Sequence, residues 1–110
     1  MVTHGEYAEP GPTRDEVNAT RGLVVLDFGT NWCGYCQGAR AAIEAALDAY
    51  PAAHHIKVED GPGRPLGRSY RVKLWPTLIM LQDGQEVARV VRPTSADEVR
   101  VGLEAAGAGG

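Results

Sequence analysis

Two cysteines three positions apart, Cys33 and Cys36, are the residues of this chain best suited to chemistry. A thiol attacks a disulfide only as its thiolate, so the pKa of the attacking thiol must fall toward the ambient pH. The free N–H groups and partial positive charge of a helix N-terminus stabilise a thiolate. Because residues three apart on a helix are neighbours, the two sulfurs can also bond to each other. The spacing therefore predicts a disulfide-exchanging pair in which Cys33 attacks and Cys36 resolves.

The same two cysteines could instead form half of a zinc site or a purely structural staple. A zinc site needs two more ligands, and the chain offers only His4 near its start and the adjacent pair His54 and His55, whose spacing is poor. A chain of 110 residues buries a core without a staple. We therefore expect no metal and no bound cofactor, only a redox-active Cys33–Cys36 disulfide.

Asp27 is the second candidate, because it lies inside the nearly continuous apolar run of residues 23–28. Burying a carboxylate is costly unless it has a partner or a task. Asp27 precedes Cys33 by six residues and points to the same end of the predicted sheet, where it would take a proton from Cys36 as that thiol attacks. Two plainer interpretations stay open: partial solvation near the strand end, or pairing with Lys57 on a neighbouring strand.

Caps, turns and hydrophobic periodicity indicate the elements that must position these residues. In chain order they are a short helix between 13 and 22, a strand at 23–28, a helix from Cys33 to Pro51, a strand at 54–59, a short helix near 66–70, strands at 76–82 and 86–91 joined by Asp83-Gly84, and a helix from Ser95 to Ala106. Strands that alternate with helices predict a parallel layer, and the hairpin adds an antiparallel pair. The fold class is therefore α/β, a mixed sheet of four or five strands flanked by helices.

The bulk composition limits the partners and the organisation of the chain. A net charge of −3 without a basic patch argues against nucleic acid and against an anionic membrane surface. No apolar run approaches the roughly 20 residues that span a bilayer. Residues 1–12 form a polar leader without the features of a signal peptide, so we expect a cytoplasmic protein. We expect one domain at 13–106, a flexible leader at 1–12, a frayed end at 107–110, and a monomer.

Several of these residues, taken in order, resemble the thioredoxin family over about residues 13–106. The matching segments are Asp27-Phe28, Trp32-Cys33-Gly34-Tyr35-Cys36, Tyr70-Arg71-Val72, Pro76-Thr77 and Asp83-Gly84. The resemblance implies the thioredoxin fold and the reduction of protein disulfides, with a flavin- and NADPH-dependent thioredoxin reductase as the partner that restores the dithiol.

The resemblance also implies roles for single residues. Cys33 would be the exposed nucleophile, Asp27 would lie behind Cys36 with Lys57 as its neighbour, and Pro76 would be cis and lie against the disulfide. The expected catalytic residues are thus Cys33, Cys36, Asp27 and Lys57. The expected substrate-binding residues are Trp32, Gly34, Tyr35, Trp75, Pro76 and Arg92.

The chain departs from the family pattern around this site. Tyr35 stands where proline is usual, and Cys-Gly-Tyr-Cys is also the motif of the bacterial periplasmic disulfide isomerase, so we predict a reduction potential less negative than that of thioredoxin. Trp75 replaces the usual isoleucine, Gly29 an aromatic residue, Ala41 a helix-kinking proline, and Arg92 lies in a segment that usually contains glycine. A more oxidising oxidase- or isomerase-like protein and a non-catalytic binding module are the competing hypotheses.

Overall fold

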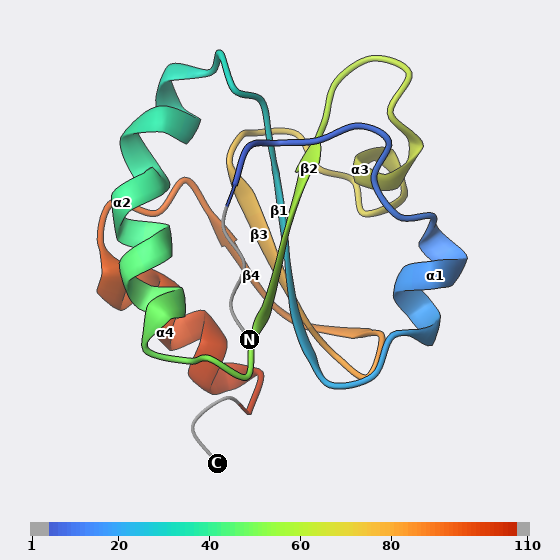
Figure 1. The fold of residues 1–110 in the computed structure, drawn as a ribbon. Coiled ribbons are helices and arrows are strands. Elements are labelled where there is room, and N and C mark those ends of the chain that lie inside the picture. Colours follow the sequence, from blue (N-terminus) through green and yellow to red (C-terminus); the bar gives the residue numbers. More distant parts are fainter. Residues whose placement is uncertain (1–4, 108–110) are drawn as a thin grey trace.

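The computed structural model describes residues 5–107 as a four-stranded sheet between two pairs of helices (Figure 1). The strands are β1 Leu23–Gly29, β2 His54–Glu59, β3 Thr77–Gln82 and β4 Gln85–Val91, and the helices are α1 Arg14–Ala19, α2 Gly34–Asp48, α3 Pro65–Ser69 and α4 Ala96–Ala105. The spatial order of the strands is β2-β1-β3-β4. The predicted mixed α/β sheet is therefore confirmed, with four strands.

Strand β1 is central, as its apolar run predicts. It pairs in parallel with β2 and antiparallel with β3, and every residue from Val24 to Gly29 is buried. Strands β3 and β4 form the predicted hairpin, whose two turn residues, Asp83 and Gly84, both have positive φ angles. Two such residues in a two-residue loop are typical of the type I′ turn, which matches the twist of the flanking strands.

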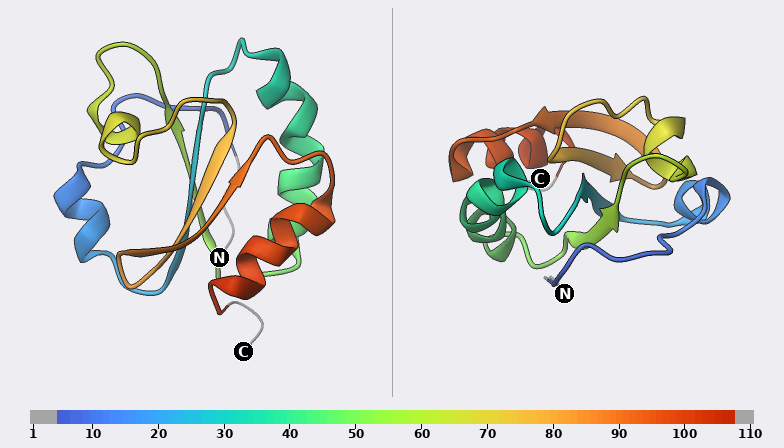
Figure 2. Two further views of the ribbon diagram at one scale, coloured as in Figure 1. Left: turned by 180° about the vertical axis from the view of Figure 1, so that it is seen from behind. Right: turned by 90° about the horizontal axis from the view of Figure 1, so that it is seen from above.

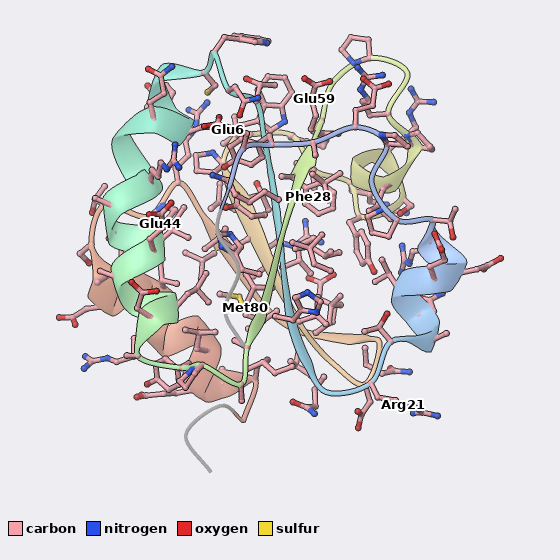
Figure 3. The ribbon with its side chains drawn as sticks, viewed as in Figure 1. Glu6, Arg21, Phe28, Glu44, Glu59 and Met80 are labelled. Carbon is pink, nitrogen blue, oxygen red and sulfur yellow. The ribbon has the colours of Figure 1, made fainter. Side chains whose placement is uncertain are left out.

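Each face of the sheet has its own core, and the alternation of side chains along β1 decides which residue enters which core. Val24, Leu26 and Phe28 pack with residues of α1 and α3, whereas Val25 packs under α2 and α4. The helix pairs lie on opposite faces (Figure 2), with Phe28 and Met80 in the two different cores (Figure 3). By the same alternation, Asp27 and Gly29 face α2, the helix that Cys33 caps and that contains Cys36.

The capping residues in the sequence predict where helices begin better than where they end. The Thr13 capping box forms in both directions, with Glu16 N–H donating to Thr13 Oγ1 and Thr13 N–H donating to Glu16. Helix α1 nevertheless ends at Ala19, earlier than the expected stop at Gly22, because Thr20 already has an extended backbone. Before α4, Ser95 caps Glu98 N–H as expected, but the Glu98 carboxylate accepts from Thr94 instead.

The segment before α1 differs from the flexible leader expected at 1–12. Ala8 forms a parallel bridge with Val58 of β2, and Glu59 N–H donates to Ala8 O at 3.0 Å. Tyr7 is buried. Side-chain packing and backbone pairing thus hold this segment against β2, which a polar composition alone does not reveal. Residues 1–4 and 108–110, which include most of the expected frayed end, lie outside the described residues.

Between residues 5 and 107 there is no helix that is both long and apolar enough to cross a bilayer.

Candidate active site

Cys33 is the N-cap residue of α2, and Cys36 lies in the first turn, as the sequence predicts. Cys33 has an extended backbone, and its carbonyl accepts the Gln37 N–H at 3.0 Å, the first hydrogen bond of the helix. No side chain caps this helix start. The unpaired N–H groups of the first turn are therefore directed at the sulfur of Cys33.

The two thiols differ in acidity. Burial acts to raise the pKa of Cys33, but hydrogen bonds from the Cys36 backbone and thiol and from the Tyr35 backbone, with the charge of Arg92, lower it below the ordinary thiol value. Burial raises the pKa of Cys36 to about 11. At neutral pH the pair therefore holds one thiol prepared to attack and one that keeps its proton.

The two cysteines differ less in solvent exposure than the family resemblance implies. Cys33 retains 9% of its surface and Cys36 3%, so Cys33 is the more accessible residue but not an open one. The two cysteines are unbridged. Together with Tyr7 they form a small apolar cluster against which Trp75 packs.

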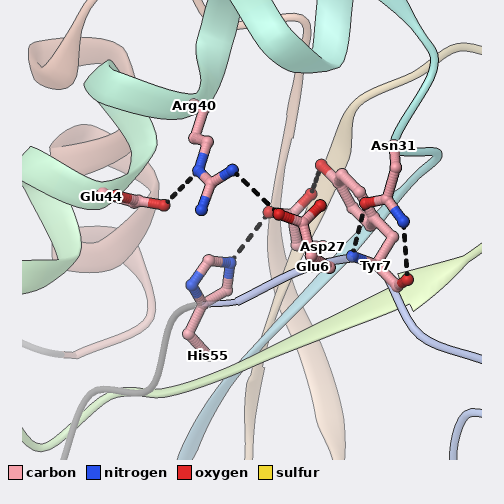
Figure 4. Close-up of polar contacts among 7 residues, drawn as sticks. All are labelled: Glu6, Tyr7, Asp27, Asn31, Arg40, Glu44 and His55. Atoms are coloured by element: carbon pink, nitrogen blue, oxygen red, sulfur yellow. Dashed lines mark hydrogen bonds and ion pairs between the residues drawn. The ribbon is translucent and has the colours of Figure 1, made fainter.

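Asp27 is fully buried, and it has two partners that the sequence did not suggest. The Tyr7 hydroxyl donates to Asp27 Oδ1 at 2.7 Å, and His55 Nε2 lies 2.9 Å from Asp27 Oδ2 (Figure 4). The interpretation of a partly solvated carboxylate is wrong, since Asp27 is 1% exposed. Burial of this carboxylate is offset by two hydrogen bonds, one to each oxygen.

Lys57 does not pair with Asp27, contrary to the expectation. The two residues are register partners on β2 and β1, but the Lys57 ammonium lies 4.4 Å from the centroid of the Tyr7 ring. His55, two residues earlier on the same face of β2, takes the carboxylate instead. A cation over an aromatic face is a favourable contact, so Lys57 helps to hold Tyr7 rather than Asp27.

Two features place Tyr7 in the site: hydrogen bonds that hold its backbone, and a space that exists because residue 29 is glycine. Tyr7 N–H donates to Asn31 Oδ1 at 2.9 Å, and Asn31 Nδ2 donates back to Tyr7 O at 3.2 Å (Figure 4). A Cβ placed on Gly29 would lie 2.5 Å from Cys36 Sγ and 2.8 Å from Tyr7 Cζ. Gly29, which stands where the family usually has an aromatic residue, thus makes room for an aromatic ring from another part of the chain.

The rim of the site is aromatic and exposed. Trp32 and Tyr35 are 73% and 62% exposed, and the Trp32 and Trp75 rings meet edge to face with centroids 5.8 Å apart. The Arg92 guanidinium lies 3.7 Å from the centroid of the Tyr35 ring and donates from Nε to the Trp75 carbonyl at 2.8 Å. Arg92 therefore ties the helix start to the β3 side of the site.

Pro76 and Gly34 complete the predicted set. The Trp75–Pro76 peptide bond is cis, as the resemblance implies, and Pro76 is buried just before β3 begins. Gly34 opens α2 with open space around its Cα. Across residues 5–107, no cluster of three or more His, Cys, Asp or Glu side chains is arranged to hold a metal ion.

Sequence reasoning missed Tyr7, His55 and Asn31. A lone aromatic residue in a polar segment and a glycine at the end of a buried strand were the two signals that point to Tyr7. For His55, the signal was its place on the same strand face as Lys57, two residues away.

A dithiol of unequal acidity at the start of a helix, beside a buried carboxylate and a mixed sheet, defines a thiol–disulfide oxidoreductase. The sequence model of the family described as Thioredoxin matches residues 11–105. The chain belongs to the thioredoxin family.

Individual relatives agree with this assignment. Thioredoxin-1 of Saccharomyces cerevisiae is 35% identical over 77 residues, which cover 70% of this chain and 75% of that protein. Thioredoxin-2 of Pyricularia oryzae is 34% identical over 69 residues, but the match spans only 40% of that relative and 63% of this chain. The solved structure of reduced thioredoxin 2 from Pseudomonas aeruginosa PAO1 is 47% identical, with a TM-score of 0.86, and the match covers 98% of this chain and 100% of that one.

Proposed function

We propose that this protein reduces disulfides of other proteins by dithiol–disulfide exchange. The observation that carries the proposal is the placement of the pair, with Cys33 at the N-cap of α2 and Cys36 buried in the first turn. In agreement with it, the pKa of Cys33 lies below the ordinary thiol value, and burial raises the pKa of Cys36 to about 11. A thiolate at Cys33 supplies the nucleophile, and a protonated thiol at Cys36 waits until the first bond has formed.

The exchange runs in two steps. The Cys33 thiolate attacks one sulfur of the substrate disulfide, forming a mixed disulfide and releasing the first substrate thiolate. Cys36 then loses its proton and attacks the Cys33 sulfur, which releases the second substrate thiolate and leaves the Cys33–Cys36 disulfide. Asp27, held behind Cys36, accepts the proton that Cys36 gives up.

The exposed rim would receive the substrate chain. Trp32 and Tyr35 supply exposed apolar area, and Trp75 meets the Trp32 ring edge to face. Pro76, buried just before β3, would lie against the substrate chain. Gly34 leaves room for a backbone to approach, and Arg92 offers a charge beside Cys33. Lys57 contributes to this site through its contact with the Tyr7 ring.

The remaining partners follow from the same chemistry. A flavin- and NADPH-dependent reductase would return the Cys33–Cys36 disulfide to the dithiol. The protein would act as a monomer in the reducing environment of the cytoplasm.

Turnover of insulin disulfides by dithiothreitol tests the proposal. The wild-type protein should accelerate precipitation of the freed insulin chains, and Cys33→Ser should not. A wild-type rate equal to that of Cys33→Ser would support a non-catalytic binding module instead.

A more oxidising role has one observation in its favour. The Arg92 charge and the helix start both stabilise the Cys33 thiolate, and a stabilised reduced form makes a dithiol more oxidising. Equilibration with glutathione gives the potential, and a value at or below that of thioredoxin would remove this alternative.

A further inference from the structure

Four buried side chains from four separate segments converge behind Cys33. They are Tyr7 from the N-terminal segment, Asp27 from β1, His55 from β2 and Cys36 from α2, and all are at most 7% exposed. Hydrogen bonds join three of them in a row, since Tyr7 donates to Asp27 Oδ1 and His55 Nε2 lies by Asp27 Oδ2. Tyr7 and Cys36 also pack in one cluster, where a Cβ placed on Gly29 would lie 2.9 Å from the Tyr7 hydroxyl oxygen and 2.5 Å from Cys36 Sγ.

We propose that Tyr7 is a catalytic residue whose hydroxyl carries the proton of Cys36 to Asp27 in the resolving step, with His55 as the positioning residue that fixes the Asp27 carboxylate. The proposal rests on the proposed function, because it assigns the proton path of the second exchange step. It adds a residue from outside the cysteine motif and places a hydroxyl between the thiol and the carboxylate.

The geometry suits the transfer of a proton from Cys36 through Tyr7 to Asp27, which we call the relay. A tyrosine hydroxyl donates one hydrogen bond and still accepts another, so Tyr7 can donate to Asp27 while it receives from Cys36. Burial and then the Asp27 charge raise the pKa of Tyr7 far above its ordinary value. The hydroxyl therefore stays neutral, and it passes a proton on by gaining one as it gives one away.

Atoms and charges balance in this step. As the Cys36 sulfur bonds to Cys33, the bond between Cys33 and the substrate sulfur breaks, and the substrate leaves as a thiolate. The Cys36 proton moves to the Tyr7 oxygen, and the Tyr7 proton moves to Asp27 Oδ1. The result is the Cys33–Cys36 disulfide, a neutral Tyr7 and a protonated Asp27.

Two further contacts hold the relay in place. Gly29 leaves the space in which Tyr7 and Cys36 meet, since any Cβ there would lie under 3 Å from both. Asn31 clamps the backbone of Tyr7 and lies in the loop that leads to Cys33. These two hydrogen bonds therefore fix the position of Tyr7 relative to this loop.

The pH dependence of the relay depends on the titratable and charged groups around it. The titratable and charged groups that surround the Tyr7–Asp27 pair are Cys33 and Cys36 from α2 and His55 and Lys57 from β2, while β3 contributes none. Arg40 on α2 is engaged with Glu6 and Glu44. Among these groups, His55 is the one whose ring nitrogen lies within hydrogen-bond distance of Asp27.

Stopped-flow reaction with dithiobis(nitrobenzoate) separates the two exchange steps. Attack by Cys33 releases a first coloured thiolate, and attack by Cys36 on the mixed disulfide releases a second. Tyr7→Phe, which removes only the hydroxyl, should slow the second phase by on the order of tenfold to a hundredfold and leave the first within about twofold. Tyr50→Phe, a matched loss of a hydroxyl just beyond the far end of α2, should change neither phase.

A double substitution tests whether Tyr7 and Asp27 act as one unit. Asp27→Asn should slow the same phase, and Tyr7→Phe combined with Asp27→Asn should be no slower than the worse single variant. Additive losses, an unchanged second phase in Tyr7→Phe, or equal slowing of both phases would overturn the relay.

A measurement on the wild-type protein tests the relay without any variant that could misfold. In deuterated water the second phase should slow by at least about twofold more than the first, because two protons move in it. No extra isotope effect would overturn the proposal. Since the colour assay uses a small disulfide, failure to turn over insulin would count against the proposed function alone.

His55 has its own test. His55→Ala should slow the second phase and shift its pH profile. His55→Gln, whose amide can still donate to Asp27, should recover most of the second-phase rate. A pH profile that His55→Ala leaves unmoved would remove His55 from the proposal.

Discussion

The two sides of the cysteine pair are built in opposite ways. Behind Cys36, Tyr7, Asp27 and His55 are buried and joined by hydrogen bonds of 2.7 and 2.9 Å. In front of Cys33, Trp32 and Tyr35 are largely exposed and held by ring contacts. In the proposed mechanism, the buried side governs how the Cys36 proton leaves, and the exposed side governs which substrates approach and how readily Cys33 ionises.

Replacing the resolving thiol should have the largest effect on this division. Cys36→Ser keeps the helix start and the rim, so Cys33 should still react with dithiobis(nitrobenzoate), but only the first coloured thiolate should be released. Turnover of insulin should fall to the level of the reaction without protein, because the mixed disulfide cannot resolve. Mass spectrometry of the trapped adduct checks the result, and release of the second thiolate would contradict the assigned roles.

The second-largest effect is expected from filling the space behind Cys36. Gly29→Ala places a methyl group 2.5 Å from Cys36 Sγ and 2.8 Å from Tyr7 Cζ, and overpacking of this kind costs about 1–3 kcal/mol of the free energy of unfolding. Urea denaturation measures it.

A matched glycine serves as the control. Gly38 lies in α2 with no heavy atom within 4 Å of its virtual Cβ, so Gly38→Ala should stabilise the protein by about 1 kcal/mol. A neutral Gly29→Ala would mean that Tyr7 does not pack where the structure places it.

The exposed side should respond through the reduction potential. Tyr35→Pro removes the ring under the Arg92 guanidinium and restores the residue usual in the family, so the potential should become more negative by on the order of tens of millivolts. Equilibration with glutathione measures the shift. An unchanged or less negative potential would contradict the role given to Tyr35.

The smallest effect is expected from a single rim charge. Arg92 helps to lower the pKa of Cys33, so Arg92→Gln should move the rise of the first-phase rate to higher pH. The sign follows because a higher pKa leaves less thiolate at any pH below it. High salt should shrink the difference between wild type and variant, since the charge is near the surface. A profile that moves to lower pH would exclude the Arg92 contribution.

Local patterns carried most of the prediction. The helix start at Cys33, the Thr13 box, the Asp83-Gly84 turn and the apolar run of β1 each depend on neighbours in sequence, and each took its predicted form. The helix ends were less certain, because Thr20 adopts an extended backbone before the glycine that marks the stop.

The partners of Asp27 depend on long-range packing and were not predictable in the same way. Tyr7 and His55 lie 20 and 28 residues away in sequence. His55 and Lys57 share one face of β2, and only the packed structure decides which of them reaches the carboxylate. Tyr7 stands in a segment with no periodicity, so its burial follows from the glycine at position 29 and from the Asn31 clamp.

The attachment of residues 5–12 to β2 has a practical consequence for engineering this protein. A shortened variant that starts at Thr13 would still contain the residues of every helix and strand, so a list of its secondary-structure elements would not show what it lacks. It would nevertheless open a hole beside Cys36 and admit solvent to the Asp27 carboxylate. Shortened variants made for engineering should therefore keep Tyr7 and Ala8.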